Sequence, residues 1–258
     1  MTVAPRRSTI RALSAAALAV VVAVGAAGCA DADAAPPEQR RFEIGGGGAG
    51  DRTLTIDIDD SPLVLVAADR TDVRVTRWFD GIAYGGSTGA RWSMEDGTLT
   101  LRPVCRGAAS CDIRHRVEVP RDIAVRVAGD NGAVTARGFR SALAITSDNG
   151  RIRVRDSTGP LELTGRNASV EATGVGAREV TAEVVNGRLT LALARVPDRV
   201  EARGTNGSAT IELPHAAYRV DAGADNGSAR VEVPRDAAGE HVVSAHSVNG
   251  DVTVRSAR

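Results

Sequence analysis

The chain has 258 residues, of which 43% are hydrophobic and 25% are charged, and this composition excludes a disordered polyelectrolyte. All 32 basic residues are Arg, which excludes lysine Schiff-base chemistry and lysine-dependent phosphate loops. The 32 acidic residues balance them, but three Arg lie within the first 28 residues, so the remainder is slightly acidic and no nucleic-acid partner is expected.

The N-terminal segment has the pattern of a secretory signal peptide. Arg6, Arg7 and Arg11 precede an uncharged stretch over residues 12–27. This stretch is shorter than the roughly 20 residues that span a bilayer as a helix, which argues against a transmembrane anchor. We therefore predict a lipoprotein signal peptide over residues 1–28. The Arg6-Arg7 pair is also similar to a twin-arginine signal, and the sequence leaves the export route open.

Residues 26–29, Ala-Ala-Gly-Cys, resemble a bacterial lipobox, in which a diacylated cysteine follows the cleavage point. The resemblance implies a palmitate-type lipid anchor at Cys29 on the extracytoplasmic face of the cell membrane, and two acyl chains suffice for stable anchoring. Residues 29–50 are rich in Ala, Pro, Gly and acidic side chains and predict a flexible tether. The alternative is ordinary cleavage that leaves Cys29 as a free thiol.

The two other cysteines, Cys105 and Cys111, enclose five residues. Because an oxidising compartment follows from export, we predict a disulfide bond between them. A metal or redox site is the alternative, but the spacing is not Cys-x-x-Cys and only His115 lies near in the sequence.

Residues 51–127 alternate apolar and polar residues irregularly, and we interpret them as the N-terminal coils and cap of a repeat domain. Both tryptophans, Trp78 and Trp92, flank a Gly-rich insertion that contains Tyr84. We expect these bulky side chains to seal the end of the core. An aromatic patch that binds a ligand is the alternative interpretation.

The dipeptide Asn-Gly recurs through the second half of the chain at intervals of 18 to 23 residues. The repeat positions are Asn131-Gly132, Asn149-Gly150, Asn167 followed by Ala168, Asn186-Gly187, Asn206-Gly207, Asn226-Gly227 and Asn249-Gly250. Self-similarity at a fixed period of this size indicates a solenoid or a blade array.

Apolar residues alternate with polar ones after each Asn, as in Ile152 and Val154, and a second alternating run follows later in each unit, as in Leu161 and Leu163. A period of two indicates strands with one buried face, and each unit of about 20 residues therefore reads strand, turn, strand, turn. Such a pattern fits an antiparallel meander with Asn-Gly hairpins or a parallel β-helix with Asn-Gly at its corners.

We favour the β-helix. Four inward side chains contribute about 6 to 12 kcal/mol, whereas ordering 20 residues costs about 20 to 40 kcal/mol, so one unit depends on stacked neighbours. The prediction is an all-β, single-stranded parallel β-helix over residues 51–258, with irregular N-terminal coils at 51–127 and regular repeats at 128–258. Outward neighbours should then be Arg153 beside Glu171, Thr190 beside Thr210 and Glu232 beside Arg255.

A lipobox, a linker, irregular strands and then a 20-residue Asn-Gly repeat together resemble the bacterial toastrack family, also called the putative-adhesin β-strand-repeat family. The resemblance covers about residues 51–256. It implies a β-helix displayed in the cell envelope, with family members encoded beside or fused to envelope-stress membrane proteins, and it supplies no catalytic residues.

We predict a membrane-anchored lipoprotein whose β-helix is a non-catalytic interaction scaffold, adhesin-like or linked to envelope-stress signalling. Its expected partners are the membrane and an envelope membrane protein or surface ligand, with no cofactor and no metal. Calcium at the Asp-Asn-Gly turns, such as Asp148-Asn149-Gly150, stays open. The rival hypothesis is a carbohydrate-active β-helix enzyme, although short coils and few aromatic residues argue against it.

Overall fold

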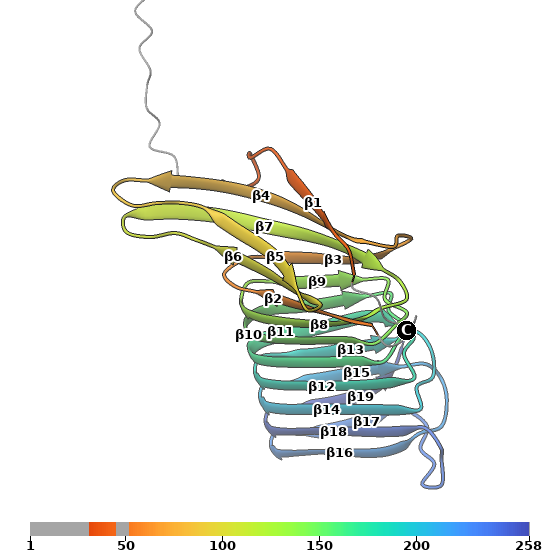
Figure 1. The fold of residues 1–258 in the computed structure, drawn as a ribbon. Helices are drawn as coiled ribbons and strands as arrows, with labels where there is room; N and C mark the ends of the chain where they lie inside the picture. The colour runs from red at the N-terminus through yellow and green to blue at the C-terminus, as the bar shows by residue number, and fades with distance from the viewer. Residues whose placement is uncertain (1–30, 45–51, 258) are drawn as a thin grey trace, which may run out of the picture.

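The computed structural model describes residues 31–44 and 52–257. The predicted signal peptide and the predicted lipid-attachment residue Cys29 lie outside these ranges. The described part is all-β, with 19 strands joined in one continuous sheet that winds into a stack of coils (Figure 1). The prediction of an all-β, parallel β-helix is confirmed for the body of the domain.

The coils of the body each contribute two runs of strand, one on each side of the Asn corner. In most coils these are two strands, whereas β10 and β11 continue through the corner as single long strands. The strands are β8 (Ala124–Asn131), β9 (Val134–Arg137), β10 (Leu143–Arg155), β11 (Leu161–Val175), β12 (Glu179–Asn186), β13 (Leu189–Leu193), β14 (Arg199–Asn206), β15 (Ala209–Leu213), β16 (Arg219–Asn226), β17 (Ala229–Glu232), β18 (Val242–Asn249) and β19 (Val252–Ser256).

Equivalent residues of neighbouring coils lie side by side in parallel register. Leu143 of β10 lies beside Leu161 of β11, which lies beside Val180 of β12. These aliphatic columns are buried, and they form one continuous core along the stack. The alternation of apolar and polar residues therefore places one column inside for every column outside, as period-two strands require.

The last coil is not the end of the stack. β18 pairs with β14 on one side and with β16 on the other, and β19 likewise lies between β15 and β17. A parallel β-helix that stacked its coils in chain order would place each coil directly over the preceding one, but here the final coil inserts between its two predecessors. The coil formed by β16 and β17 becomes the end, where Asp221 and Arg230 give it exposed charges that suit an open edge.

The first coil is inserted in the same way. It consists of β2 (Thr53–Ile58) and β3 (Leu63–Ala68). β2 pairs in parallel with both β6 (Thr98–Pro103) and β8, and β3 pairs in parallel with both β7 (Ala109–Pro120) and β9. Both terminal coils are thus held between two neighbours.

The cap differs from the coils that we expected over residues 51–127, because it is partly antiparallel. β4 (Val73–Ala83) pairs antiparallel with β7, and β5 (Ala90–Glu95) pairs antiparallel with β6. Figure 1 shows β4 and β7 extending past the side of the stack as a ribbon. The long strands extend because their outer halves pair with each other and need no coil beneath them.

The segment expected to be a flexible tether, residues 29–50, is folded where the structure describes it. β1 (Glu38–Phe42) pairs antiparallel with β4, with Phe42 opposite Val73. Phe42 is buried in the core, and Arg40 stacks over its ring. Residues 31–44 therefore belong to the cap, because one buried aromatic and a strand ladder hold a segment whose composition indicated a linker.

Valine truncations test the order of the coils. Val254 lies between Ile211 and Val231 and is fully buried, whereas Val231 lies in the end coil and is half-buried. Val254→Ala should lower the free energy of unfolding by about 2 kcal/mol, and Val231→Ala by less than about 1 kcal/mol. Urea unfolding of both variants measures the difference. A larger loss for Val231→Ala would place the coils in chain order instead.

Candidate functional site

The Asn corners form one continuous ladder along the stack. The side-chain Nδ2 of each Asn donates to the Oδ1 of the Asn in the neighbouring coil, at 2.8 to 3.1 Å. The order along the ladder is Asn131, Asn149, Asn167, Asn186, Asn206, Asn249 and Asn226. The ladder thus follows the inserted order of the coils.

The ladder continues past its predicted first member. Asn131 Nδ2 donates to Asp60 Oδ1 at 2.8 Å, and the Ser61 N–H donates to the Asn131 carbonyl at 3.2 Å. Asp60-Ser61 therefore occupies the corner of the first coil, where it replaces Asn-Gly. The Asn-Gly repeat does not indicate this pair, because Asp60 stands in place of Asn and its carboxylate oxygen accepts the same hydrogen bond.

The glycine that follows every ladder Asn except Asn167 allows neighbouring corners to touch. The Gly207 N–H donates to the Asn249 carbonyl at 2.8 Å, and Gly207 has a φ of +139°. A Cβ added to Gly207 would lie 1.8 Å from the carbonyl oxygen of Gly187 in the next coil. Only glycine fits this contact, so the Asn-Gly dipeptide serves the stacking of coils.

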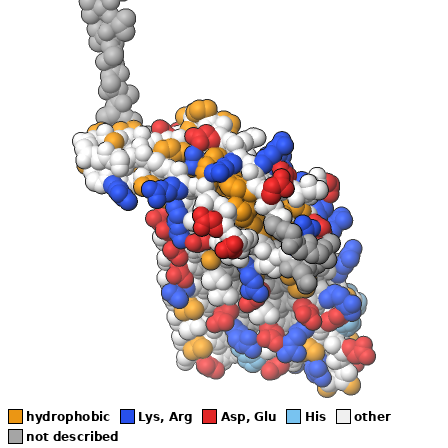
Figure 2. Space-filling model, viewed as in Figure 1, with side chains coloured by type: hydrophobic (Ala, Val, Ile, Leu, Met, Phe, Trp, Pro, Cys, Tyr) orange, Lys and Arg blue, Asp and Glu red, His pale blue; other side chains and the backbone are white. Residues whose placement is uncertain are grey.

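Outward side chains form rows of polar pairs. Arg153 Nε donates to Glu171 Oε2 at 3.2 Å, and Thr190 lies beside Thr210, as predicted. Glu232 is the register neighbour of Arg255, as predicted, but the Arg255 guanidinium hydrogen-bonds to Glu212 on the other side. Figure 2 shows both charge signs interspersed over the visible face of the stack.

Hollows lie along these outer faces, and two of them cross several neighbouring coils. An open groove crosses the starts of β8, β10, β11 and β12, with Ala142, Ala144 and Pro160 among its apolar lining and Arg126 and Glu162 among its charged lining. A second hollow lies over β10, β11 and β13, and its lining residues are Arg151, Arg153, Ser169, Val170, Glu171, Arg188 and Thr190. Both are surfaces that a partner could cover.

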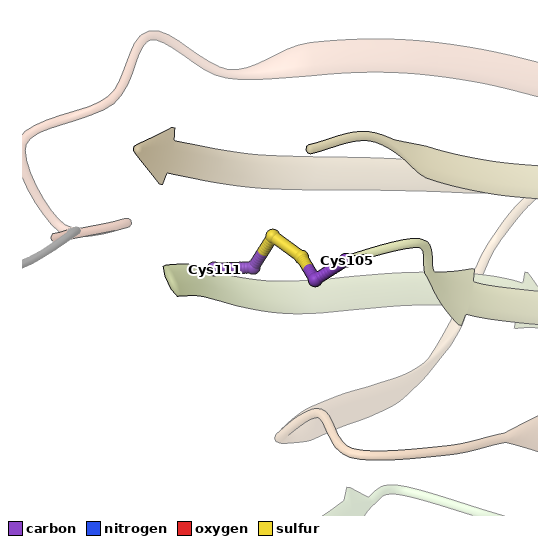
Figure 3. The surroundings of a disulfide bond; sticks show 2 residues. All are labelled: Cys105 and Cys111. Atoms are coloured by element: carbon purple, nitrogen blue, oxygen red, sulfur yellow. A yellow bond between two sulfur atoms is a disulfide. The ribbon is translucent and has the colours of Figure 1, made fainter. Parts of the chain in front are cut away.

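The predicted disulfide bond between Cys105 and Cys111 is confirmed (Figure 3). The two Cα atoms are 6.4 Å apart, within the usual range for disulfides. The bond ties the connection after β6 to the start of β7, next to an isolated bridge between Ser87 and Arg106. It therefore fixes the outer end of the β4–β7 ribbon.

Both tryptophans belong to the cap, and each has a guanidinium over one ring face. Arg114 lies 4.6 Å from the ring centroid of Trp78, and Arg77 lies 4.1 Å from that of Trp92. Trp92 also packs against the core. These cation–π contacts, and the hydrogen bond from Arg77 Nη1 to the Ala90 carbonyl, give the rings a packing role in the cap.

A buried polar pair lies beneath the cap. Ser61 Oγ and His115 Nδ1 are 2.7 Å apart, and each residue is at most 2% exposed. Burial, with a smaller effect from the nearby positive charge of Arg77, lowers the pKa of His115 to about 4. The imidazole is therefore neutral at pH 7. A pair enclosed in this way is part of the core packing and is closed to a substrate.

An ion cluster holds the inner end of the ribbon. Arg70, Arg74 and Arg116 all hydrogen-bond to the carboxylate of Glu118. Burial alone would raise the pKa of Glu118, but the hydrogen bonds and charges of Arg74 and Arg116 outweigh it, so the pKa lies below its usual value. Glu118 therefore stays ionised and joins β4 to β7.

Residues 31–44 and 52–257 contain no group of three or more His, Cys, Asp or Glu side chains placed to hold a metal ion. Within the same ranges no helix has the length and hydrophobicity to cross a bilayer. The aspartate of the turn at Asp148 pairs with Arg166 at 3.3 Å.

No family model and no curated protein matches the chain. Similar solved structures include a putative adhesin from Bacteroides fragilis, with 14% identity, a TM-score of 0.45, and coverage of 86% of this chain and 97% of that one. A putative adhesin from Parabacteroides distasonis has 14% identity, a TM-score of 0.44, and coverage of 87% and 98%. A putative cell adhesion protein from Clostridium sporogenes has 11% identity, a TM-score of 0.35, and coverage of 86% and 100%.

The buried His115 should make stability depend on pH. Its folded pKa of about 4 lies below its ordinary value of 6.5, so the unfolded chain binds the proton first as the pH falls. The contribution of His115 to the free energy of unfolding should be fully present above pH 6.5, and it should fall by up to about 3 kcal/mol towards pH 4. Urea unfolding across this range measures the slope.

His115→Asn is the matched variant, because Asn keeps a polar group near Ser61 but does not titrate. Its free energy of unfolding should change less between pH 6.5 and 4 than that of the unmodified chain. Equal slopes for the two proteins would show that His115 is not the group that titrates.

Proposed function

We propose that this chain is a cell-envelope lipoprotein, anchored through Cys29, whose β-helix is a non-catalytic scaffold for interaction with a partner. The observation that carries the proposal is the regular, polar and open outer surface of the β-helix. Regular columns of polar side chains cover the outward face of the sheet on both sides of the Asn corner, and the hollows in this surface are open. Such a surface offers many small contacts to a large partner.

The end coil adds a second surface of this kind. Within the described residues, β16 pairs only with β18 and β17 pairs only with β19. Their outer edges therefore present backbone N–H and C=O groups, to which a partner strand can add. Exposed charges such as Asp221 and Arg230 would make such pairing selective.

The partner that we propose is an envelope membrane protein or a surface ligand, which corresponds to an adhesin-like role or to envelope-stress signalling. The lipobox-like sequence at residues 26–29 supports placement in the envelope, and the bond between Cys105 and Cys111 fits an oxidising compartment. Catalysis on polysaccharide finds less support, because the Ser61–His115 pair is buried and both tryptophans pack in the cap.

Replacement of Cys29 tests the anchor. In a bacterial host that processes lipoproteins, the unmodified chain should fractionate with membranes and incorporate labelled palmitate, whereas Cys29→Ser should lose the label and appear in the soluble extracytoplasmic fraction. Cys105→Ser with Cys111→Ser is the matched control, and it should keep the label. Unchanged fractionation of Cys29→Ser would contradict the proposed anchor.

A further inference from the structure

The segment that follows Cys29 is fastened to the outer half of the β4–β7 ribbon. The Asp31 N–H donates to Asp80 Oδ2 at 2.8 Å, and the Ala32 N–H donates to Asp112 Oδ2 at 2.9 Å. Asp80 and Asp112 are register partners on β4 and β7. Ala32 is only 2% exposed, so the segment packs against the ribbon rather than lying free.

An ion pair completes this attachment. Arg114 of β7 pairs with Asp33, and the same guanidinium stacks on Trp78 of β4. Two backbone donors, one ion pair and one buried methyl group therefore hold three consecutive residues. Contacts of this number, made to two paired strands, fix where the chain leaves the ribbon.

The same face of the ribbon ends in an exposed aromatic residue. Because side chains alternate along a strand, Trp78, Asp80 and Ile82 share one face of β4, and Tyr84 follows them at the outer end. Tyr84 is 67% exposed, and its N–H donates to the Ala108 carbonyl at 2.7 Å. The disulfide bond and the Ser87–Arg106 bridge hold this end in shape.

We propose that this face of the ribbon, the Tyr84 face, rests on the lipid headgroups of the membrane that holds the anchor. The inference depends on the proposed function and extends it. Cys29 is two residues from Asp31, so the lipidated residue can lie no more than about 7 Å from the Asp31 Cα. A free tether over residues 29–50 would instead span up to about 75 Å and leave the orientation undefined.

The side chains on this face suit the bilayer surface. Tyrosine favours the membrane–water interface, where its ring is apolar and its hydroxyl stays hydrated. Four carboxylates at this attachment would repel anionic headgroups, and each has a partner. Those of Asp31, Asp80 and Asp112 accept backbone N–H groups, and that of Asp33 pairs with Arg114. Tyr84 and half-buried Ile82 therefore present apolar area where the lipids begin.

This orientation places the rest of the molecule. The cap lies at one end of the stack and β16 at the other (Figure 1). With the cap against the lipids, the open edges of β16 and β17 would face away from the membrane. The lipid surface and the proposed partner would then meet opposite ends of the scaffold.

Tryptophan quenching by brominated lipid tests the proposal. The full chain, purified in its lipidated form, is reconstituted into vesicles of brominated phosphatidylcholine and phosphatidylglycerol. The reporter variant carries Trp78→Phe, Trp92→Phe and Tyr84→Trp, and the matched control carries the same two Phe substitutions with Val248→Trp. Val248 is 41% exposed and lies on β18, near the opposite end of the stack. Circular dichroism checks that both variants keep their strand content.

The reporter at position 84 should shift to shorter wavelength and lose most of its emission, while the reporter at position 248 should not. Adding Asp80→Ala and Asp112→Ala should reduce the quenching at position 84 without detaching the protein from the vesicles. Flotation of the vesicles distinguishes a wrong orientation from a missing anchor. Protein that floats with an unquenched reporter at position 84 overturns the orientation alone, and protein that does not float overturns the anchor and the orientation together.

Discussion

The stack depends on the close contact between coils at the Asn-Gly corner. The side-chain amides donate hydrogen bonds towards the cap, as Asn186 does to Asn167. The backbone N–H groups of the corners donate in the opposite direction, as that of Gly187 does to the Asn206 carbonyl. Because the Asn ladder runs through every regular coil, and the Gly contact recurs in all of them except the one with Asn167-Ala168, the corners set one register for both flanking strands. A slip of one residue would break both sets and turn the aliphatic columns outward.

The first and last coils of the domain are both inserted between neighbouring strands, which protects them from fraying. A terminal strand has few neighbours and frays, yet β2–β3 and β18–β19 each lie between two coils. The exposed end opposite the cap is formed by β16 and β17, an inner part of the chain that covalent continuity holds on both sides. The antiparallel cap covers one end and leaves the other with open edges, and this asymmetry gives the scaffold a membrane side and a partner side in our proposal.

Much of the body follows from the sequence, because period-two alternation and a fixed repeat are local signals. These two signals predict the strands, the inward columns and the corner residues. The coil order required more than local signals. The last Asn step, from Asn226 to Asn249, is 23 residues where the others are 18 to 20, and the extra length belongs to the connection that returns the chain from β17 to β18.

Contacts between distant segments explain the other differences. Composition indicates a tether before residue 50, but acceptors from Asp80 and Asp112, some 49 and 80 residues away, fold its start onto the ribbon. The Ser61–His115 pair joins residues 54 apart in the sequence, and the corner at Asp60 uses a carboxylate in place of Asn. No periodicity reports such pairs, because each occurs once.

The most direct test of the corner compares two alanine substitutions by urea unfolding. Gly207 and Gly85 both have positive φ, but a Cβ at Gly207 meets the Gly187 carbonyl, whereas a Cβ at Gly85 meets no atom within 4 Å. Alanine at a positive φ costs both variants about 1 kcal/mol of backbone strain. Gly85→Ala should therefore lower the free energy of unfolding by about that much, and Gly207→Ala should lower it by about 3 kcal/mol or more. Equal losses would contradict the claim that contact between corners holds the coils together.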